Sequence, residues 1–119
     1  MWKDATEMAL AVRTGQVSAK ELVAEAIERI EEENPALNAV VSKQYEQALQ
    51  EAETGDFQDK PFGGVPLLLK DLGQNEEGHL STAGSRLFQN YRARHTDKLV
   101  QAFKDLGLII LGRTNTPEF

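Results

Sequence analysis

Lys70 stands at the end of an apolar run, residues 65–69 (Val-Pro-Leu-Leu-Leu), and Asp71 follows it at once. A run of this composition predicts a buried strand. Burial disfavours the ammonium form of a lysine and can lower its pKa by as much as ~3–5 units. A lysine kept neutral near pH 7 acts as a general base. The alternative is that Lys70 reaches into solvent and pairs with Asp71 or a neighbouring acid, as most lysines do.

A second segment with chemically useful residue types is Ser81-Thr82-Ala83-Gly84-Ser85. It is small and rich in hydroxyl groups, which suits a close approach of backbone to a ligand. The two histidines, at positions 79 and 95, are isolated in the sequence, and this argues against a metal site. The chain has no cysteine, which excludes a thiol nucleophile and a disulfide framework.

The second half of the chain, residues 62–119, has the pattern of a βαβ unit. Residues 65–69 predict the first strand, and residues 108–111 (Leu-Ile-Ile-Leu) predict the second. Between them, Thr96 is expected to cap a helix that ends at Gly107. The apolar residues of this helix recur at helical spacing: Leu99, Val100, Phe103 and Leu106.

A βαβ unit implies parallel strands and a right-handed crossover. In such sheets, ligands collect beyond the carboxyl ends of the strands. Lys70 lies at the carboxyl end of the first strand, and residues 112–115 (Gly-Arg-Thr-Asn) lie at that of the second. The sequence therefore predicts that Lys70 and residues 112–115 meet at one edge of the sheet.

The first half, residues 1–61, is mainly helical in pattern. Capping-box sequences begin at Asp4 and at Ser18, Gly15 is expected to end the first helix, and Asn34-Pro35 the second. Residues 39–42 predict a short strand, and residues 45–52 return to helical spacing. The second helix carries one apolar stripe, formed by Leu22, Val23, Ala26, Ile27 and Ile30.

Length and charge exclude several classes of function. The 119 residues correspond to one domain, and 13 Lys and Arg against 19 Asp and Glu leave a net charge of −6. Nucleic-acid binding requires a basic surface, and a membrane span requires ~18 apolar residues, so neither partner is expected. No apolar signal-peptide core is found at the N-terminus, and we expect a cytoplasmic protein without a metal or cofactor. A nucleotide-binding βαβ domain is also excluded, because no glycine-rich phosphate loop lies between strand and helix.

Several motifs occur in the order and register of one known family. They are Gly-Gly-Val-Pro at 63–66, Leu-Leu-Leu-Lys-Asp at 67–71, Ser-Thr-Ala-Gly-Ser at 81–85 and Leu-Gly-Arg-Thr-Asn-Thr-Pro-Glu-Phe at 111–119. In the helical half, Gly-Gln-Val-Ser at 15–18, Asn-Pro at 34–35 and Leu-Asn-Ala at 37–39 agree in order and spacing. Together they resemble the opening third of an amidase signature family enzyme, and the resemblance covers nearly the whole chain.

The resemblance implies a fold and a chemistry. The expected fold class is α/β, with N-terminal helices followed by a βαβ unit, as part of a larger mixed sheet. Family members hydrolyse carboxamides with a Ser–cis-Ser–Lys triad, and Lys70 matches the lysine. It would accept a proton from the bridging serine and so activate the nucleophilic serine. A small-molecule amide is the implied substrate, and the acyl group passes to water or to another nitrogen nucleophile.

The same resemblance assigns supporting roles to further residues. Asp71 would fix the strand end or its loop, and Thr114, Asn115 and Glu118 would organise the turn after the second strand. Phe119 would lie near the acyl pocket. The supporting or site-lining residues are Asp71, Thr82, Gly84, Ser85, Asn115 and Phe119.

The resemblance implies that both triad serines lie in a glycine- and serine-rich segment downstream of the position of Phe119. Ser81 and Ser85 match a different motif, and we expect them to position the Lys70 loop or to line the site. We therefore expect residues 1–119 to be the N-terminal portion of an amidase domain and to be inactive alone. Residues 116–119 (Thr-Pro-Glu-Phe) resemble free-standing amidases more than the glutaminyl-tRNA amidotransferase A subunit, which favours hydrolysis. The alternative is a non-catalytic binding or self-assembly module of amidase ancestry, because residues 108–111 would form an exposed sheet edge open to pairing.

Overall fold

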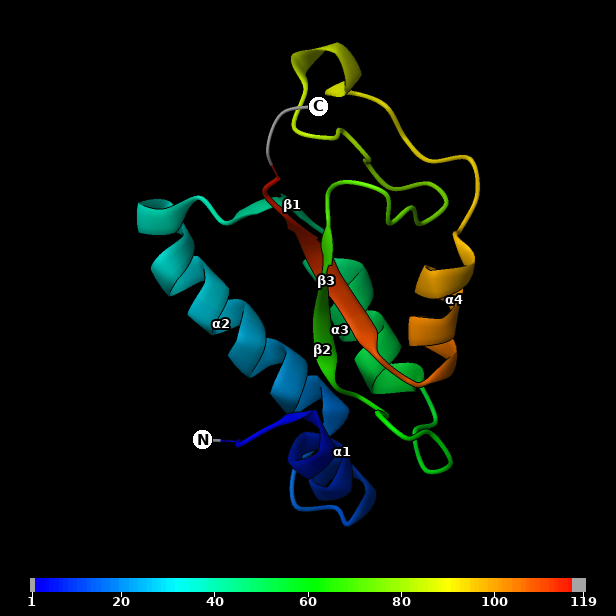
Figure 1. Cartoon of the computed structure of the whole chain (residues 1–119). Coiled ribbons are helices and arrows are strands. Elements are labelled where there is room, and N and C mark those ends of the chain that lie inside the picture. Colours follow the sequence, from blue (N-terminus) through cyan, green and yellow to red (C-terminus); the bar gives the residue numbers. More distant parts are fainter. Residues whose placement is uncertain (1, 117–119) are drawn as a thin grey trace.

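A computed structural model describes residues 2–116, in which helices surround a small mixed sheet (Figure 1). The α/β fold class is confirmed. The strand order is β1-β3-β2, with β2 parallel and β1 antiparallel to β3. The elements in chain order are α1 (Ala5–Arg13), α2 (Ala19–Leu37), β1 (Val40–Lys43), α3 (Tyr45–Thr54), β2 (Pro66–Lys70), the 3₁₀ helix η1 (Arg86–Phe88), α4 (Lys98–Asp105) and β3 (Ile109–Thr114).

The sheet has a helix layer on each face. The side chains of Ile109 and Leu111 pack against α2 and α3, whereas Ile110 packs with Leu69 against Val100 of α4. Successive residues of a strand point to opposite faces, so β3 needs apolar residues at consecutive positions. This explains why residues 108–111 read as a continuous apolar run.

The expectation that residues 108–111 form a sheet edge is wrong. β3 is the central strand, and the edges among the described residues are β1 and β2. β1 pairs with β3 on the side opposite β2 and forms a register irregularity between Val40 and Ser42. Such a short strand lies too far from β3 in sequence for pattern alone to reveal the pairing.

Two predicted helix boundaries are also wrong. α2 continues through Pro35 to Leu37, and Asn38 ends it in the left-handed conformation (φ 50°). Asn34 is a residue of the helix, and its side chain accepts from the Val40 amide at 2.8 Å and donates to the Val40 carbonyl at 2.9 Å. At α4 the N-cap is Asp97 rather than Thr96, whose hydroxyl accepts a hydrogen bond from the Glu77 amide at 3.0 Å.

Other expectations at the helices are confirmed in part. Ser18 and Glu21 form both halves of a capping box, and Asp4 caps α1. The Glu7 carboxylate, however, accepts a hydrogen bond from the Lys3 amide, not from the Asp4 amide as a capping box requires. Leu99 does not belong to the packed face of α4, because its side chain is 52% exposed. No helix among the described residues has the length and apolar character that a membrane span needs.

Gly112 lets β1 approach β3. A Cβ atom at this position would lie 2.2 Å from the carbonyl oxygen of Ser42. We expect Gly112→Ala to force β1 away and to reduce the free energy of unfolding by about 1–3 kcal/mol, as overpacking does. Urea unfolding measures the loss, and hydrogen exchange of the Gln44 amide, which bonds Leu111, locates it at β1.

The control is Gly15→Ala, where no atom lies within 4 Å of the added methyl group and only the positive φ is strained. It should leave exchange at Gln44 unchanged. Equal exchange of Gln44 in the Gly112→Ala chain and the unchanged chain would contradict the role of Gly112.

Candidate functional site

Lys70 lies beside the carboxyl end of β3, where the sequence places it. In the parallel ladder Lys70 is the partner of Thr114, and Leu69 is the partner of Arg113. The Asp71 amide donates to the Thr114 carbonyl at 3.1 Å, and the Thr114 hydroxyl to the Leu69 carbonyl at 3.3 Å. The ends of β2 and β3 are therefore joined by side chains as well as by the ladder.

The main chain of Lys70 is held on both sides. Its amide donates to the Gln74 side-chain oxygen at 2.7 Å, and its carbonyl accepts from Arg113 Nη2 at 3.0 Å. The residue is exposed, and within residues 2–116 its ammonium group forms no ion pair. Of the alternative, the reach of Lys70 into solvent is confirmed, whereas its pairing with Asp71 is wrong, because Asp71 is bound to Arg113. Lys70 thus combines a fixed backbone with an ammonium group open to solvent.

Asp71 and Arg113 form an ion pair in which each residue is 1% exposed. Arg113 Nε donates to Asp71 Oδ1 at 3.0 Å, and the Thr82 amide donates to the same oxygen at 2.9 Å. The Thr82 hydroxyl binds the other carboxylate oxygen, and Arg113 Nη2 also binds the Gln74 carbonyl. The pair joins the end of β2, β3 and the loop at Thr82 next to Lys70.

The segment around Thr82 is a tight turn that sets where its hydroxyl groups point. Ala83 and Gly84 both have positive φ (53° and 66°), and the Ser85 amide donates to the Thr82 carbonyl at 3.0 Å, as in a type I′ turn. Ser85 Oγ accepts from the Leu87 amide and begins η1, and Ser81 Oγ donates to Asn75 at 2.6 Å. The hydroxyl groups of Ser81 and Ser85 therefore form hydrogen bonds within the loop itself.

Asn115 lies on the β1 side of the sheet end. Its amide donates to the Ala39 carbonyl at 2.7 Å, and its side-chain nitrogen to the Asn38 carbonyl at 3.3 Å. These contacts tie the residue after β3 to the segment between α2 and β1. Phe119 and Glu118 lie outside the described residues.

Sequence reasoning missed Glu76, a carboxylate that is 2% exposed. Gln44 Nε2 donates to Glu76 Oε1 at 3.0 Å, and His79 Nε2 lies 3.6 Å from the same oxygen. Lys104 Nζ lies 2.5 Å from the other oxygen, Oε2. Burial by itself raises the pKa of Glu76, but the hydrogen bonds from Lys104 and Gln44 and the charge of Lys104 outweigh it and hold the pKa below its usual range. Glu76 fastens the loop after Lys70 to α4 and to the start of α3.

The motif at 111–119 contains Arg113, to which sequence reasoning gives no role. The signal that could have found it is an arginine two positions after the buried apolar run 108–111, since a charge so close to a core must be paired. The partner could not be read from sequence, because Asp71 lies 42 positions away.

Arg113→Met leaves Asp71 buried without its counter-charge, and we expect a loss of about 3–5 kcal/mol in the free energy of unfolding. Asp71→Asn combined with Arg113→Met should recover part of it, because no charge is then buried. Urea unfolding of the four chains of this double-mutant cycle measures the coupling. Additive losses would show that the two side chains do not act as a pair.

The lowered pKa of Glu76 predicts a pH dependence of stability. A carboxyl with a folded-state pKa below its ordinary value of 4.5 stabilises the fold above that pH, and the contribution disappears as the pH falls through the folded value. We expect Glu76→Gln to lose about 1–3 kcal/mol at neutral pH and to differ less from the unchanged chain in acid. Thermal unfolding against pH measures this, and Glu77→Gln, an exposed neighbour, is the control. A constant difference at all pH values would contradict the assignment.

Several known proteins are similar to this chain in sequence and in fold. The lipoamidase of Enterococcus faecalis is 43% identical over 98% of this chain, which covers 16% of that protein. The 6-aminohexanoate-cyclic-dimer hydrolase of Paenarthrobacter ureafaciens is 39% identical over 99% of the chain and 24% of that protein. A structure of 6-aminohexanoate cyclic dimer hydrolase in complex with substrate superposes with a TM-score of 0.90 at 39% identity, over 98% of this chain and 24% of that one.

The chain spans a quarter or less of the length of these relatives, rather than the third that its motifs suggested. The amidase family model matches residues 21–119. This match includes Lys70, Asp71, the turn at Thr82 and Arg113. The chain belongs to the amidase family.

Proposed function

We propose that this chain supplies the catalytic lysine of an amidase that hydrolyses carboxamide C–N bonds. The observation that carries the proposal is the state of Lys70: its amide and carbonyl are both fixed, yet its ammonium group has no ion-pair partner in the part of the chain described. A lysine that must meet a reacting group gains from a fixed backbone, because misplacement by about 1 Å can cost ~10²-fold in rate.

In the proposed mechanism Lys70 accepts a proton from a bridging serine. That serine takes the proton of the nucleophilic serine, which attacks the amide carbonyl. The amine leaves and water then releases the acyl group. The residues that match family motifs here include neither serine, so both belong to sequence that these 119 residues do not contain.

The roles proposed for the other site residues follow from their contacts. Asp71 and Thr82 are positioning residues, because they act on Lys70 through Arg113 and β2. Gly84 and Ser85 shape the turn that carries Thr82, and Asn115 holds the turn after β3. Relatives named as a hydrolase and a lipoamidase favour hydrolysis of a small-molecule amide over transfer to another amine.

Self-association through the β2 edge is disfavoured by two features of that edge. Pro66 has no N–H group to donate, and the Lys70 amide is already bound to Gln74. An edge that offers so few free donors pairs poorly with a second strand.

The role of Lys70 is tested in a chimera. The 119-residue chain replaces the matching segment of the Paenarthrobacter ureafaciens hydrolase, and hydrolysis of the cyclic dimer by the chimera is measured. We expect Lys70→Ala to lower kcat of the chimera by ~10²-fold or more, because a general base typically contributes that much. We also expect the 119-residue chain alone to turn over no simple aryl amide.

Lys20→Ala is the matched control, because Lys20 is exposed and pairs with Glu53 on the helical side of the molecule. It should leave kcat unchanged. A chimera that keeps its activity with Lys70→Ala would disprove the role of Lys70. Turnover by the 119-residue chain that Lys70→Ala abolishes would disprove its inactivity.

A further inference from the structure

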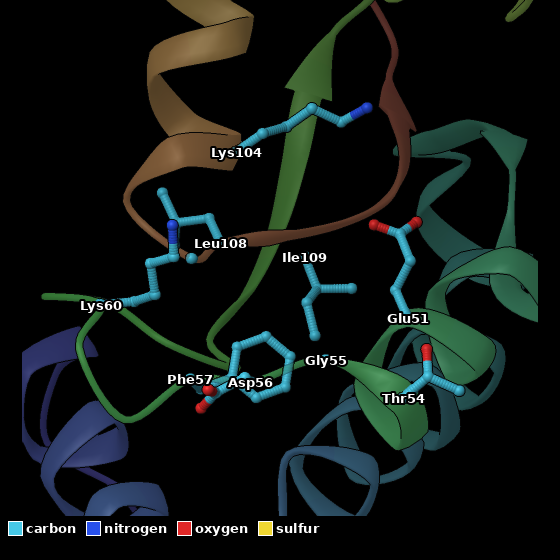
Figure 2. Close-up of a pocket in the computed structure, with 10 residues that line it drawn as sticks. Glu51, Thr54, Gly55, Asp56, Phe57, Lys60, Lys104, Leu108 and Ile109 are labelled. Atoms are coloured by element: carbon cyan, nitrogen blue, oxygen red, sulfur yellow. The ribbon is translucent and has the colours of Figure 1, made fainter.

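A cavity of ≈ 220 Å³ opens at the end of the sheet opposite Lys70 (Figure 2). Ile109, the first residue of β3, forms part of its wall, whereas Lys70 pairs with the last residue of that strand. The volume equals about seven water molecules at ~30 Å³ each, enough for a molecule the size of an amino acid. The lining residues are Glu51, Thr54, Gly55, Asp56, Phe57, Lys60, Lys104, Gly107, Leu108 and Ile109.

The apolar part of the wall is formed by Phe57, Leu108 and Ile109. The Phe57 ring lies against Gly55, where a Cβ atom would come within 2.5 Å of ring atom Cζ. A turn in which the Lys60 amide donates to the Phe57 carbonyl at 3.2 Å fixes both residues. The aromatic surface of the cavity is therefore built into the backbone around it.

Charged groups of opposite sign stand on different sides of this apolar surface. Figure 2 shows the Lys60 ammonium group near Leu108 and the Glu51 carboxylate on the far side of Ile109, whereas the Asp56 carboxylate lies on the side of the Phe57 ring away from Glu51. Within residues 2–116 none of the three forms an ion pair. Lys104, in contrast, is bound to Glu76. The cavity thus has one cation, Lys60, and one carboxylate, Glu51, on opposite sides of its apolar wall, and neither is in an ion pair.

Two helices end at the cavity, and one of them strengthens this polarity. α3 ends at Thr54 on the side of Glu51, whereas α4 ends at Asp105, next to Leu108 on the side of Lys60. The carboxyl end of a helix carries a partial negative charge that favours cations. α3 has no basic residue in its last turn to use that field. The side of the cavity formed by Glu51 and Thr54 is therefore suited to an ammonium group from outside the chain.

We propose that this cavity binds a small zwitterion whose ammonium and carboxylate groups are joined by an apolar stem, such as an ω-amino carboxylate. The ammonium group lies toward Glu51, the stem crosses Phe57 and Ile109, and the carboxylate meets Lys60. This site is separate from the Lys70 end of the sheet and does not depend on the proposed amidase chemistry.

The test is a titration of the 119-residue chain with 5-aminopentanoate, followed by the NMR shifts of the Ile109 methyl groups and the Phe57 ring. We expect saturation with a Kd of about 1 mM. Lys60→Gln should weaken 5-aminopentanoate about tenfold and leave pentylamine unaffected, whereas Glu51→Gln should weaken both about tenfold, because each variant removes one charged hydrogen-bonding group.

Glu53→Gln is the matched control, since this exposed residue of the same helix pairs with Lys20 outside the cavity. It should leave both affinities unchanged. The proposal is overturned if no saturable shift is seen at ten times the expected Kd, if pentylamine binds the unchanged chain as tightly as the zwitterion, or if Glu53→Gln has the effect expected of Glu51→Gln.

Discussion

The buried ion pair between Asp71 and Arg113 is the interaction on which the Lys70 end of the molecule depends. Burying two charges costs several kcal/mol per ion, and their attraction repays this only when other hydrogen bonds satisfy the groups. Here Thr82 supplies two of these bonds to the carboxylate, and the carbonyls of Lys70 and Gln74 accept from Nη2 of the guanidinium, whereas the buried Nη1 has no hydrogen-bond partner among the described residues. An apolar pair could hold β2 and β3 together, but it could not fix the Lys70 carbonyl and the Thr82 turn in one geometry.

The layered sheet makes this arrangement possible. Helices α2 and α3 cover one face and α4 covers the other, so β3 is shielded on both faces while β1 and β2 flank it. Arg113 lies in this shielded strand, where water cannot compete for its charge. Parallel pairing of β2 with β3 brings Lys70 and Asp71 to the same end. The opposite end, where α3 and α4 finish, is left with the charged cavity around Ile109.

Local patterns in the sequence carry much of the fold. The βαβ unit and the Ser18 capping box could be predicted, because each depends on periodicity or on neighbours a few residues apart. The meeting of Lys70 with residues 112–115 could be predicted as well, because a βαβ unit brings the carboxyl ends of its parallel strands to one edge. The failures involve contacts outside the helix concerned. Pro35 stays helical while the Asn34 side chain binds Val40, and the Thr96 hydroxyl accepts from the Glu77 amide and does not cap α4.

The sequence by itself determined the family, the parallel βαβ unit and the lysine at its carboxyl edge, because motifs in register and apolar periodicity are written along the chain. Only the tertiary structure decided that β3 is central, that Asp71 pairs with Arg113 rather than with Lys70, and that Glu76 binds Gln44 and Lys104. Which charges pair depends on which are brought together out of water, and that follows from packing between segments far apart in the sequence.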